Sequence, residues 1–278
     1  MSRIQNILDK AEREGAVRSV RIMTEPAAAT ALAYDAPAIV PPPAKEEFAA
    51  VSAPPQPIAA PAARVVRDAH LDPTLVAALR PSAAPAEQYR ALRTRLAHAD
   101  HGTPIDVLLV TSPGRGEGKS LTAANLALTM AQEYQTRICI VDANLRHAGL
   151  HSLFGVEDTP GLADVLTGQA NLADALITFE HQQITLLPAG HGPWHPAELL
   201  GSTAMRRTIQ TLRSQFDRVI IDAPAAAPLA DVGILAPLVD SVLLVVQAGV
   251  TTKPAIQEAV ATIGTGKLLG VVLNGSAE

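Results

Sequence analysis

The amino-acid sequence predicts an α/β fold with a doubly wound, mostly parallel sheet that is flanked by helices. Short apolar runs of strand length alternate with stretches in which apolar residues recur at helical spacing, as in successive βαβ units. The runs are continuous in their apolar character, which is typical of strands buried on both faces of a sheet. The predicted strands cover residues 105–110, 138–141, 184–187, 219–221, 242–246 and 268–273, and the predicted helices between them cover residues 121–133, 204–215 and 254–263.

The first 80 residues differ in composition from the rest of the chain. Residues 1–20 predict a short amphipathic helix, because Ile4, Ile7 and Leu8 fall on one helical face. Residues 21–80 are rich in alanine and proline and are expected to form a disordered, semi-extended linker, since such a segment buries too little apolar surface to fold. Near its end, residues 71–79 are compatible with a turn of helix that packs on the main domain. That domain is predicted over residues 81–278.

The composition restricts the class of protein. The chain has 278 residues, a net charge of −5 and a pI of about 5.9, so nothing indicates a general nucleic-acid binder. A single cysteine, Cys139, excludes an internal disulfide. No apolar run approaches the length of about 18 residues that spans a membrane, and the first residues lack the apolar stretch of a signal peptide. We therefore expect a cytoplasmic protein.

A helix is also predicted over residues 85–99, ahead of the first strand of the domain. Its apolar residues share one face, and Glu87, Arg90 and Arg93 share another because they are spaced three residues apart. Taken alone, this second set indicates a solvated charged face with a local ion pair.

The strand at residues 105–110 is followed by a glycine-rich loop and by a helix that begins near Lys119. Such glycines let backbone N–H groups point at phosphate oxygens, while the lysine reaches the phosphates and the next hydroxyl ligates Mg²⁺. The strict pattern asks for glycine at position 113, where this chain has Pro113. The flanking strand and helix nevertheless disfavour a chance match in a turn. We expect a phosphate-binding P-loop formed by Gly114, Gly116, Glu117, Gly118, Lys119, Ser120 and Leu121.

Two of the predicted strands end on an acid, Asp142 and Asp222. A single aspartate after a strand is most often a turn or helix-capping residue. In an open α/β sheet, however, ligands lie outside the carboxyl ends of the strands, so both acids are expected to face the P-loop. Carboxylates suit Mg²⁺, and we expect Ser120, Asp142 and Asp222 to hold this ion.

Together these motifs resemble the BY-kinase family, the bacterial tyrosine kinases of capsular and exopolysaccharide synthesis, which belong to the P-loop ATPases. The resemblance covers roughly residues 81–274. Residues 111–112 and 116–120 are similar to Walker A, residues 141–146 to Walker A′ and residues 220–224 to Walker B. Further similar stretches lie at residues 161–166, 187–190, 196–200 and 270–274.

The resemblance implies roles for individual residues. A family member binds ATP and Mg²⁺ and transfers the γ-phosphate of ATP to protein tyrosine. Lys119 would bind phosphates, Ser120 would hold the metal, and Asp142 and Asp222 would act on it directly or through water. Asp142 is the better candidate to orient or deprotonate the tyrosine hydroxyl. Arg146 would stabilise the transferring charge.

The resemblance also implies partners. Asn274 would contact the adenine of ATP. Glu87, Arg90 and Arg93 match the ExxRxxR motif, which supports ring-like self-assembly in the family. A further expected partner is the cytoplasmic part of a membrane polysaccharide chain-length regulator, which would recruit the protein to the inner face of the plasma membrane. No nucleic-acid partner is expected.

Two departures from the family pattern leave three hypotheses about function. Asn144 stands where Walker A′ usually has a second acid, and an amide neither takes a proton nor carries charge. The usual tyrosine cluster near the C-terminus is missing, and the tyrosines are Tyr34, Tyr89 and Tyr134.

The first hypothesis is a tyrosine kinase of exopolysaccharide biosynthesis. The second is a non-kinase, ATP-dependent regulator or co-polymerase scaffold, and the third is a ParA/MinD-like partitioning ATPase, which is disfavoured because Gly114 replaces the signature lysine of that class.

Overall fold

The computed structural model describes residues 64–67, 69–99, 104–133, 135–192 and 194–275, all within one compact unit, Pro61–Glu278. The predicted helix over residues 1–20 lies outside the described residues. Tyr134 and most of the predicted linker, including Tyr34, also lie outside the described residues.

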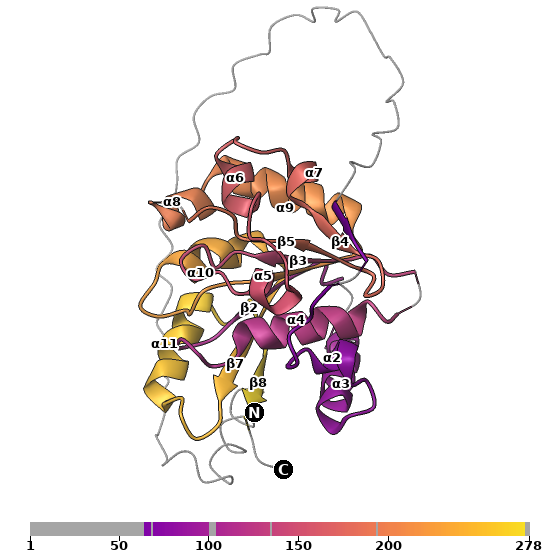
Figure 1. Cartoon of the computed structure of the whole chain (residues 1–278). Helices are drawn as coiled ribbons and strands as arrows, with labels where there is room; N and C mark the ends of the chain where they lie inside the picture. Colours follow the sequence, from indigo (N-terminus) through magenta and orange to yellow (C-terminus); the bar gives the residue numbers. More distant parts are fainter. Residues whose placement is uncertain (1–63, 68, 100–103, 134, 193, 276–278) are drawn as a thin grey trace, which may run out of the picture. The chain divides into compact units, whose positions relative to one another are not determined.

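The centre of this unit is an eight-stranded sheet with the strand order β1-β4-β5-β3-β6-β2-β7-β8 (Figure 1). Neighbouring strands pair in parallel except β4 and β5, which are antiparallel. The predicted α/β fold with a mostly parallel sheet is therefore confirmed. All six predicted strands are present, whereas β1 and β4 were not predicted. The strands are β1 (Arg64–Val66), β2 (Val107–Thr111), β3 (Ile138–Asp142), β4 (Ile177–Phe179), β5 (Ile184–Leu187), β6 (Arg218–Asp222), β7 (Ser241–Gln247) and β8 (Leu268–Asn274).

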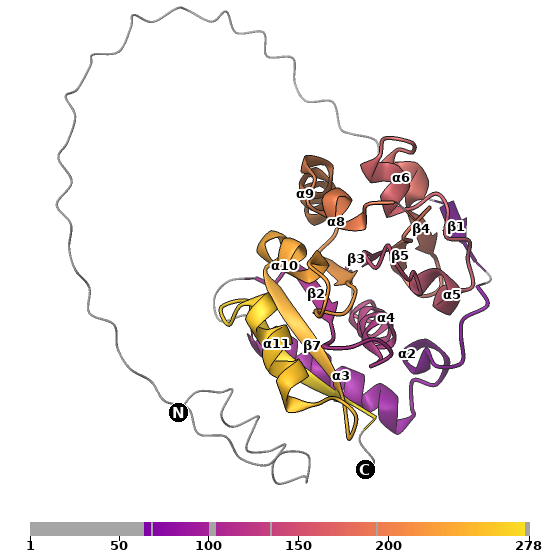
Figure 2. The same cartoon turned by 90° about the vertical axis from the view of Figure 1, so that its left-hand side faces the viewer.

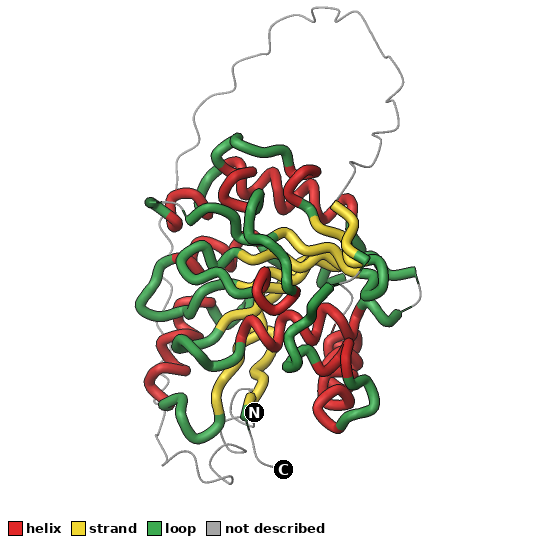
Figure 3. Tube along the Cα trace, in the orientation of Figure 1, coloured by secondary structure: helices red, strands yellow, loops and turns green. Residues whose placement is uncertain are grey.

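Helices lie on both faces of the sheet (Figures 1 and 3). The four longer predicted helices are confirmed as α3, α4, α9 and α11, and α2 lies within the predicted turn of helix over residues 71–79, whereas the other helices of four or five residues were not predicted individually. None of the helices in the described part of the chain has the length and apolar character needed to cross a membrane. The helices are α2 (Val76–Leu79), α3 (Ala84–Ala99), α4 (Lys119–Met130), α5 (Leu150–Phe154), α6 (Leu162–Leu166), α7 (Leu172–Ala175), α8 (Pro196–Leu200), α9 (Thr203–Gln215), α10 (Asp231–Leu235), a 3₁₀ turn (Ala236–Leu238) and α11 (Lys253–Ile263).

Helices lie on either side of the sheet (Figure 2), and two apolar cores fill the space between them and the sheet, one on each face. On one face, α4 contributes its buried side chains together with α2, α3 and α5, and Phe154 packs on Phe179 with ring centroids 5.1 Å apart. On the other face, α6, α8, α9, α10 and α11 cover the sheet. Because strands β2 and β3 are buried along their whole length, their ends are fixed in position relative to these helices.

The folded unit begins earlier than the predicted boundary at residue 81. Strand β1 pairs with β4, and α2 packs on α4, as the predicted turn of helix over residues 71–79 anticipated. Asn125, buried in the middle of α4, joins the two segments. Its Oδ1 accepts a hydrogen bond from the Ala77 N–H at 3.0 Å, and its Nδ2 donates to the Thr74 carbonyl at 3.1 Å. Residues 64–79 therefore belong to the domain, because buried amide contacts and β pairing offset the cost of ordering them.

Candidate functional site

The glycine-rich loop connects β2 to α4, as the sequence predicted. Gly116 and Gly118 have φ angles of +79° and +88°, in the left-handed region that favours glycine. Gly118 is the N-cap of α4, so the helix begins at Lys119 with its first backbone N–H groups at the loop. A helix N-terminus and a glycine-rich loop together form an anion-binding site.

Two side chains hold this loop from within the chain. The Glu117 carboxylate accepts hydrogen bonds from the Gly114 N–H at 3.0 Å and from the Thr251 hydroxyl at 2.6 Å. Asn274, at the end of β8, donates from Nδ2 to the Glu117 carbonyl at 3.0 Å. A Cβ at Gly118 would lie 2.1 Å from this Nδ2, so the residue must be glycine. These contacts fix the loop before any ligand arrives.

Lys119 lies between Ser120 and the acid at the end of β6. Its Nζ is 3.0 Å from Ser120 Oγ and 3.6 Å from Asp222 Oδ1, and its side chain is almost completely buried. The structure thus brings together three of the predicted site residues, Lys119, Ser120 and Asp222. The ammonium group supplies positive charge at the start of α4, where phosphate oxygens would lie.

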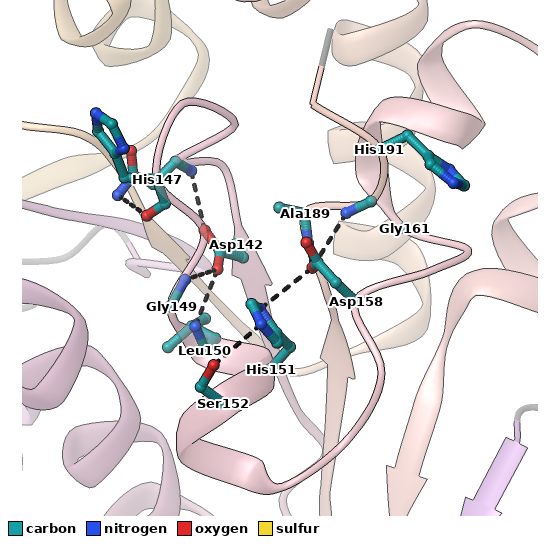
Figure 4. Close-up of polar contacts among 12 residues, drawn as sticks. Asp142, His147, Gly149, Leu150, His151, Ser152, Asp158, Gly161, Ala189 and His191 are labelled. Atoms are coloured by element: carbon teal, nitrogen blue, oxygen red, sulfur yellow. Dashed lines mark hydrogen bonds and ion pairs between the residues drawn. The ribbon is translucent and has the colours of Figure 1, made fainter.

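Asp142 and Asp222 are direct neighbours, because β3 and β6 pair in parallel with these two residues in register. Both are fully buried. Asp142 accepts three backbone hydrogen bonds, from Asn144 to Oδ1 at 3.0 Å and from Gly149 and Leu150 to Oδ2 at 2.9 and 3.0 Å (Figure 4). Burial raises the pKa of Asp142, and these amides oppose the rise. Asp142 therefore shapes the loop after β3 and also faces the site.

Asp222 has no comparable set of donors. Neither of its oxygens accepts a hydrogen bond from the described part of the chain. Burial raises the pKa of Asp222 to about 7; the nearby Lys119 lowers it and the neighbouring Asp142 raises it further. A buried carboxylate without donors is costly, and it is the group in this site most in need of a ligand.

Asn144 presents a second unpartnered acceptor. Its Nδ2 donates to the His147 carbonyl at 2.5 Å, while its Oδ1 is buried without a hydrogen bond within the described residues. Near Lys119, the oxygens of Asp222 and the Ser120 hydroxyl form an all-oxygen set of groups, which suits Mg²⁺. The described residues contain no cluster of three His, Cys, Asp or Glu side chains for a metal. An ion here would keep several waters and bind phosphate oxygens, as Mg²⁺ usually does.

Arg146 is paired within the chain. Its Nε and Nη2 lie 2.8 and 3.2 Å from the two carboxylate oxygens of Asp231, the first residue of α10. Asp231 is fully buried. This bidentate pair ties the loop after β3 to α10, and it was not visible in the sequence because the partners are far apart along the chain.

The charged face of α3 has the predicted local ion pair. Arg90 lies 2.6 Å from Glu87, whose side chain is 65% exposed. Arg93 has two contacts with α4 and the turn after it, since it donates to the Thr129 carbonyl at 2.9 Å and lies 3.1 Å from Glu133. Arg93 therefore satisfies a carbonyl near the C-terminus of the P-loop helix, and Glu87 is the most exposed member of the motif.

Comparison with known proteins identifies the family. The AAA domain family matches residues 107–268. The chain is 34% identical over 216 residues to the tyrosine-protein kinase YwqD of Bacillus subtilis, which covers 77% of this chain and 91% of that protein. The chimerical protein CapA2B2 has a similar structure, with a TM-score of 0.71 and 28% identity over 78% of this chain and 95% of that chain. The kinase domain of the Escherichia coli tyrosine kinase ETK follows, with a TM-score of 0.70 and 28% identity over 73% and 80% of the two chains. With a P-loop, two neighbouring acids and these relatives, the chain belongs to the family of bacterial tyrosine-protein kinases of the P-loop ATPase type.

Proposed function

We propose that this protein is an ATP-dependent tyrosine kinase of exopolysaccharide or capsule biosynthesis, which transfers the γ-phosphate of ATP to protein tyrosine. The observation that carries this proposal is the buried lysine of the P-loop, Lys119, placed between Ser120 and Asp222, whose oxygens accept no hydrogen bond from the described residues. The names of the relatives support the choice of tyrosine as acceptor.

The residues of the site would have different roles in phosphoryl transfer. The N–H groups of the loop and Lys119 would bind and orient the phosphates, and Ser120 and Asp222 would hold Mg²⁺, which neutralises charge on the transferring group. Asp142, beside Asp222, would add negative charge next to the ion without being a ligand itself. Asp142 already accepts three hydrogen bonds, and a carboxylate has about four lone-pair sites. One site therefore remains, through which Asp142 would orient the tyrosine hydroxyl or accept its proton. Arg146, held by Asp231, would act on the transferring charge from the edge of the site.

Asn274 is predicted to contact adenine, and we propose a second role for it in supporting the P-loop. Its amide already supports the P-loop through the Glu117 carbonyl. An adenine contact would use Oδ1 or the second N–H of Nδ2, because the Glu117 carbonyl engages only one of the two donors. Asn274 is thus proposed to connect the base and the phosphate parts of the ATP site.

A second function, the non-kinase regulator, is favoured by two observations. Asn144 is neutral, and its amide donates to the His147 carbonyl, a bond that a carboxylate at this position would lose. Tyr89 is also a poor acceptor within the chain, because it is half-buried in α3, and burial raises its pKa. In this alternative, ATP binding controls assembly without tyrosine transfer.

The partners and the location are part of the same proposal. Self-association would use the α3 face that carries Glu87, Arg90 and Arg93, and the membrane partner would be a polysaccharide chain-length regulator. The protein would then act on the cytoplasmic side of the plasma membrane. Since Glu87 is the most exposed of the three side chains, it is the residue through which this face most readily reaches a neighbour.

The first prediction concerns catalysis. Incubation of the protein with labelled ATP, Mg²⁺ and a random glutamate–tyrosine copolymer should yield labelled phosphotyrosine. Asp142→Asn should lower the rate by roughly 10²–10⁴-fold, the contribution of a positioned base, with little change in ATP affinity. Labelling by Asn144→Asp but not by the parent would favour the regulator, and equal rates in parent and Asp142→Asn would contradict the role of Asp142.

The second prediction concerns pH and Asp222. A folded pKa of about 7 lies above the ordinary value, so the folded state keeps a proton that the unfolded state releases. Stability contributed by this carboxyl is therefore present at acidic pH and falls as the pH rises towards 7. Without Mg²⁺ and nucleotide, Asp222→Asn should be more stable than the parent at pH 8 by about 1–3 kcal/mol and show a smaller gain at pH 5.

Thermal unfolding at both pH values measures this difference. Asp217→Asn is the control, because Asp217 precedes the same strand, is half-exposed and has a pKa lowered by its hydrogen bonds with Arg137. An equal gain for Asp222→Asn at pH 5 and pH 8 would show that Asp222 does not titrate as described.

The third prediction concerns self-association. Glu87→Ala should lower the oligomer mass measured by light scattering while leaving the domain folded, because an exposed ion pair contributes little to stability, about 0–1 kcal/mol. Glu258→Ala, which removes the same charge from exposed α11, is the control and should leave the mass unchanged. If both variants keep the mass of the parent, Glu87 belongs to a plain solvated face.

A further inference from the structure

We propose that Trp194 is a docking residue for the acceptor polypeptide, at the rim of the ATP site. This inference rests on the proposed kinase function. Trp194 is the chain's single tryptophan and is 97% exposed, in the connection between β5 and α8. A fully exposed tryptophan leaves a large apolar surface in water, and this residue type is enriched at the centre of protein interfaces.

Buried contacts fix the start of this connection. The Asp158 Oδ1 accepts hydrogen bonds from the Ala189 and Gly190 N–H groups at 3.1 and 3.3 Å. Asp164, which is buried, lies 2.8 Å from His191 Nδ1 and also accepts from the His191 N–H at 3.4 Å. The start of the connection, up to His191, therefore has a defined path.

Close packing of two glycines reinforces the path. Gly190 has a φ of +81°, and a Cβ placed on Gly161 would lie 2.2 Å from the Gly190 nitrogen. Asp164 also accepts from the Gly161 N–H at 2.8 Å, so the same carboxylate holds both glycine-containing segments. A segment fixed in this way loses little conformational entropy when a partner binds beside it.

The same network reaches the catalytic acid. Strand β5 neighbours β3, so the connection after β5 runs beside the loop after Asp142. A Cβ at Gly192 would lie 3.9 Å from the Leu145 carbonyl in that loop. Asp158 also lies 3.5 Å from His151 Nδ1 in α5, the helix whose first N–H groups donate to Asp142 (Figure 4). Trp194 thus follows a segment that is joined to the catalytic loop.

The position of Trp194 indicates which kind of partner would bind there. A polypeptide that brings a tyrosine to Asp142 must pass the rim of the site, where Trp194 offers an aromatic face for stacking and apolar contact. His195 follows the tryptophan in the sequence and is exposed, so its imidazole is available for hydrogen bonds with a tyrosine-containing segment. The probe that matches these features is a random copolymer of glutamate and tyrosine.

Fluorescence tests binding directly, because all tryptophan emission of the protein arises from residue 194. The copolymer should change the emission in a saturable manner and protect the indole from quenching by acrylamide. This readout does not require phosphoryl transfer. An emission that the copolymer leaves unchanged would overturn the proposal. A change that depends on protein concentration without copolymer would also overturn it, since a second copy would then cover the tryptophan.

Kinetics provides the second readout. Trp194→Ala should raise the KM for the copolymer by about tenfold or more, with kcat and Mg·ATP affinity unchanged, and Trp194→Phe should keep most of the affinity. Val250→Ala, at a valine that is 62% exposed, is the control. An unchanged KM in Trp194→Ala would overturn the proposal. If the parent transfers no phosphate at all, the kinase function fails, and the fluorescence measurement decides the docking role by itself.

Discussion

Two buried carboxylates stand side by side at the ends of neighbouring strands, and one lysine lies within reach of them. The register of β3 and β6 places Asp142 beside Asp222, and both side chains are fully buried. Such a pair is costly unless charge or hydrogen bonds compensate it. The compensation differs between the two acids. Three backbone amides donate hydrogen bonds to Asp142, whereas the Lys119 ammonium lies near Asp222. Asp142 is therefore fixed in orientation by its hydrogen bonds. The oxygens of Asp222 accept none from the described residues, so they can bind a ligand.

The opposite side of the site is built from the other half of the sheet. Glu117 joins the glycine-rich loop to Thr251 after β7, and Asn274 joins it to the end of β8. The loop is therefore shaped by contacts that do not involve phosphate. Preorganised N–H groups cost nothing to reorient when the ligand binds, which is the main advantage of an electrostatic site in a rigid scaffold. Chemistry that depends on placement, as phosphoryl transfer does, fits this arrangement.

The sequence predicted the features that depend on local pattern. Continuous apolar runs identified six strands, and the glycine-rich loop with Lys119 and Ser120 followed from residue spacing. Asp222 was found because it ends such a run. Features that depend on long-range contacts were missed. Strands β1 and β4 have three residues each, too few for a periodic signal, and they form only because they pair with each other and with β5. The partners of Arg146 and Asn274 were likewise hidden, because nothing local connects residue 146 to Asp231 or residue 274 to Glu117.

The proposed ATP site depends most on the contact between Lys119 and the phosphates of ATP. Calorimetric titration of Mg·ATP into the parent and Lys119→Met measures this contact. The loss of a charge-assisted hydrogen bond should cost about 1.5–3 kcal/mol, or roughly 10–150-fold in affinity. Lys253→Met, which removes the same charge at the start of α11, should bind as the parent does. The double variant Lys119→Met with Asp222→Asn removes the buried acid as well, so its folding does not depend on the pair. Equal affinity for Mg·ATP in the parent and Lys119→Met would contradict the account.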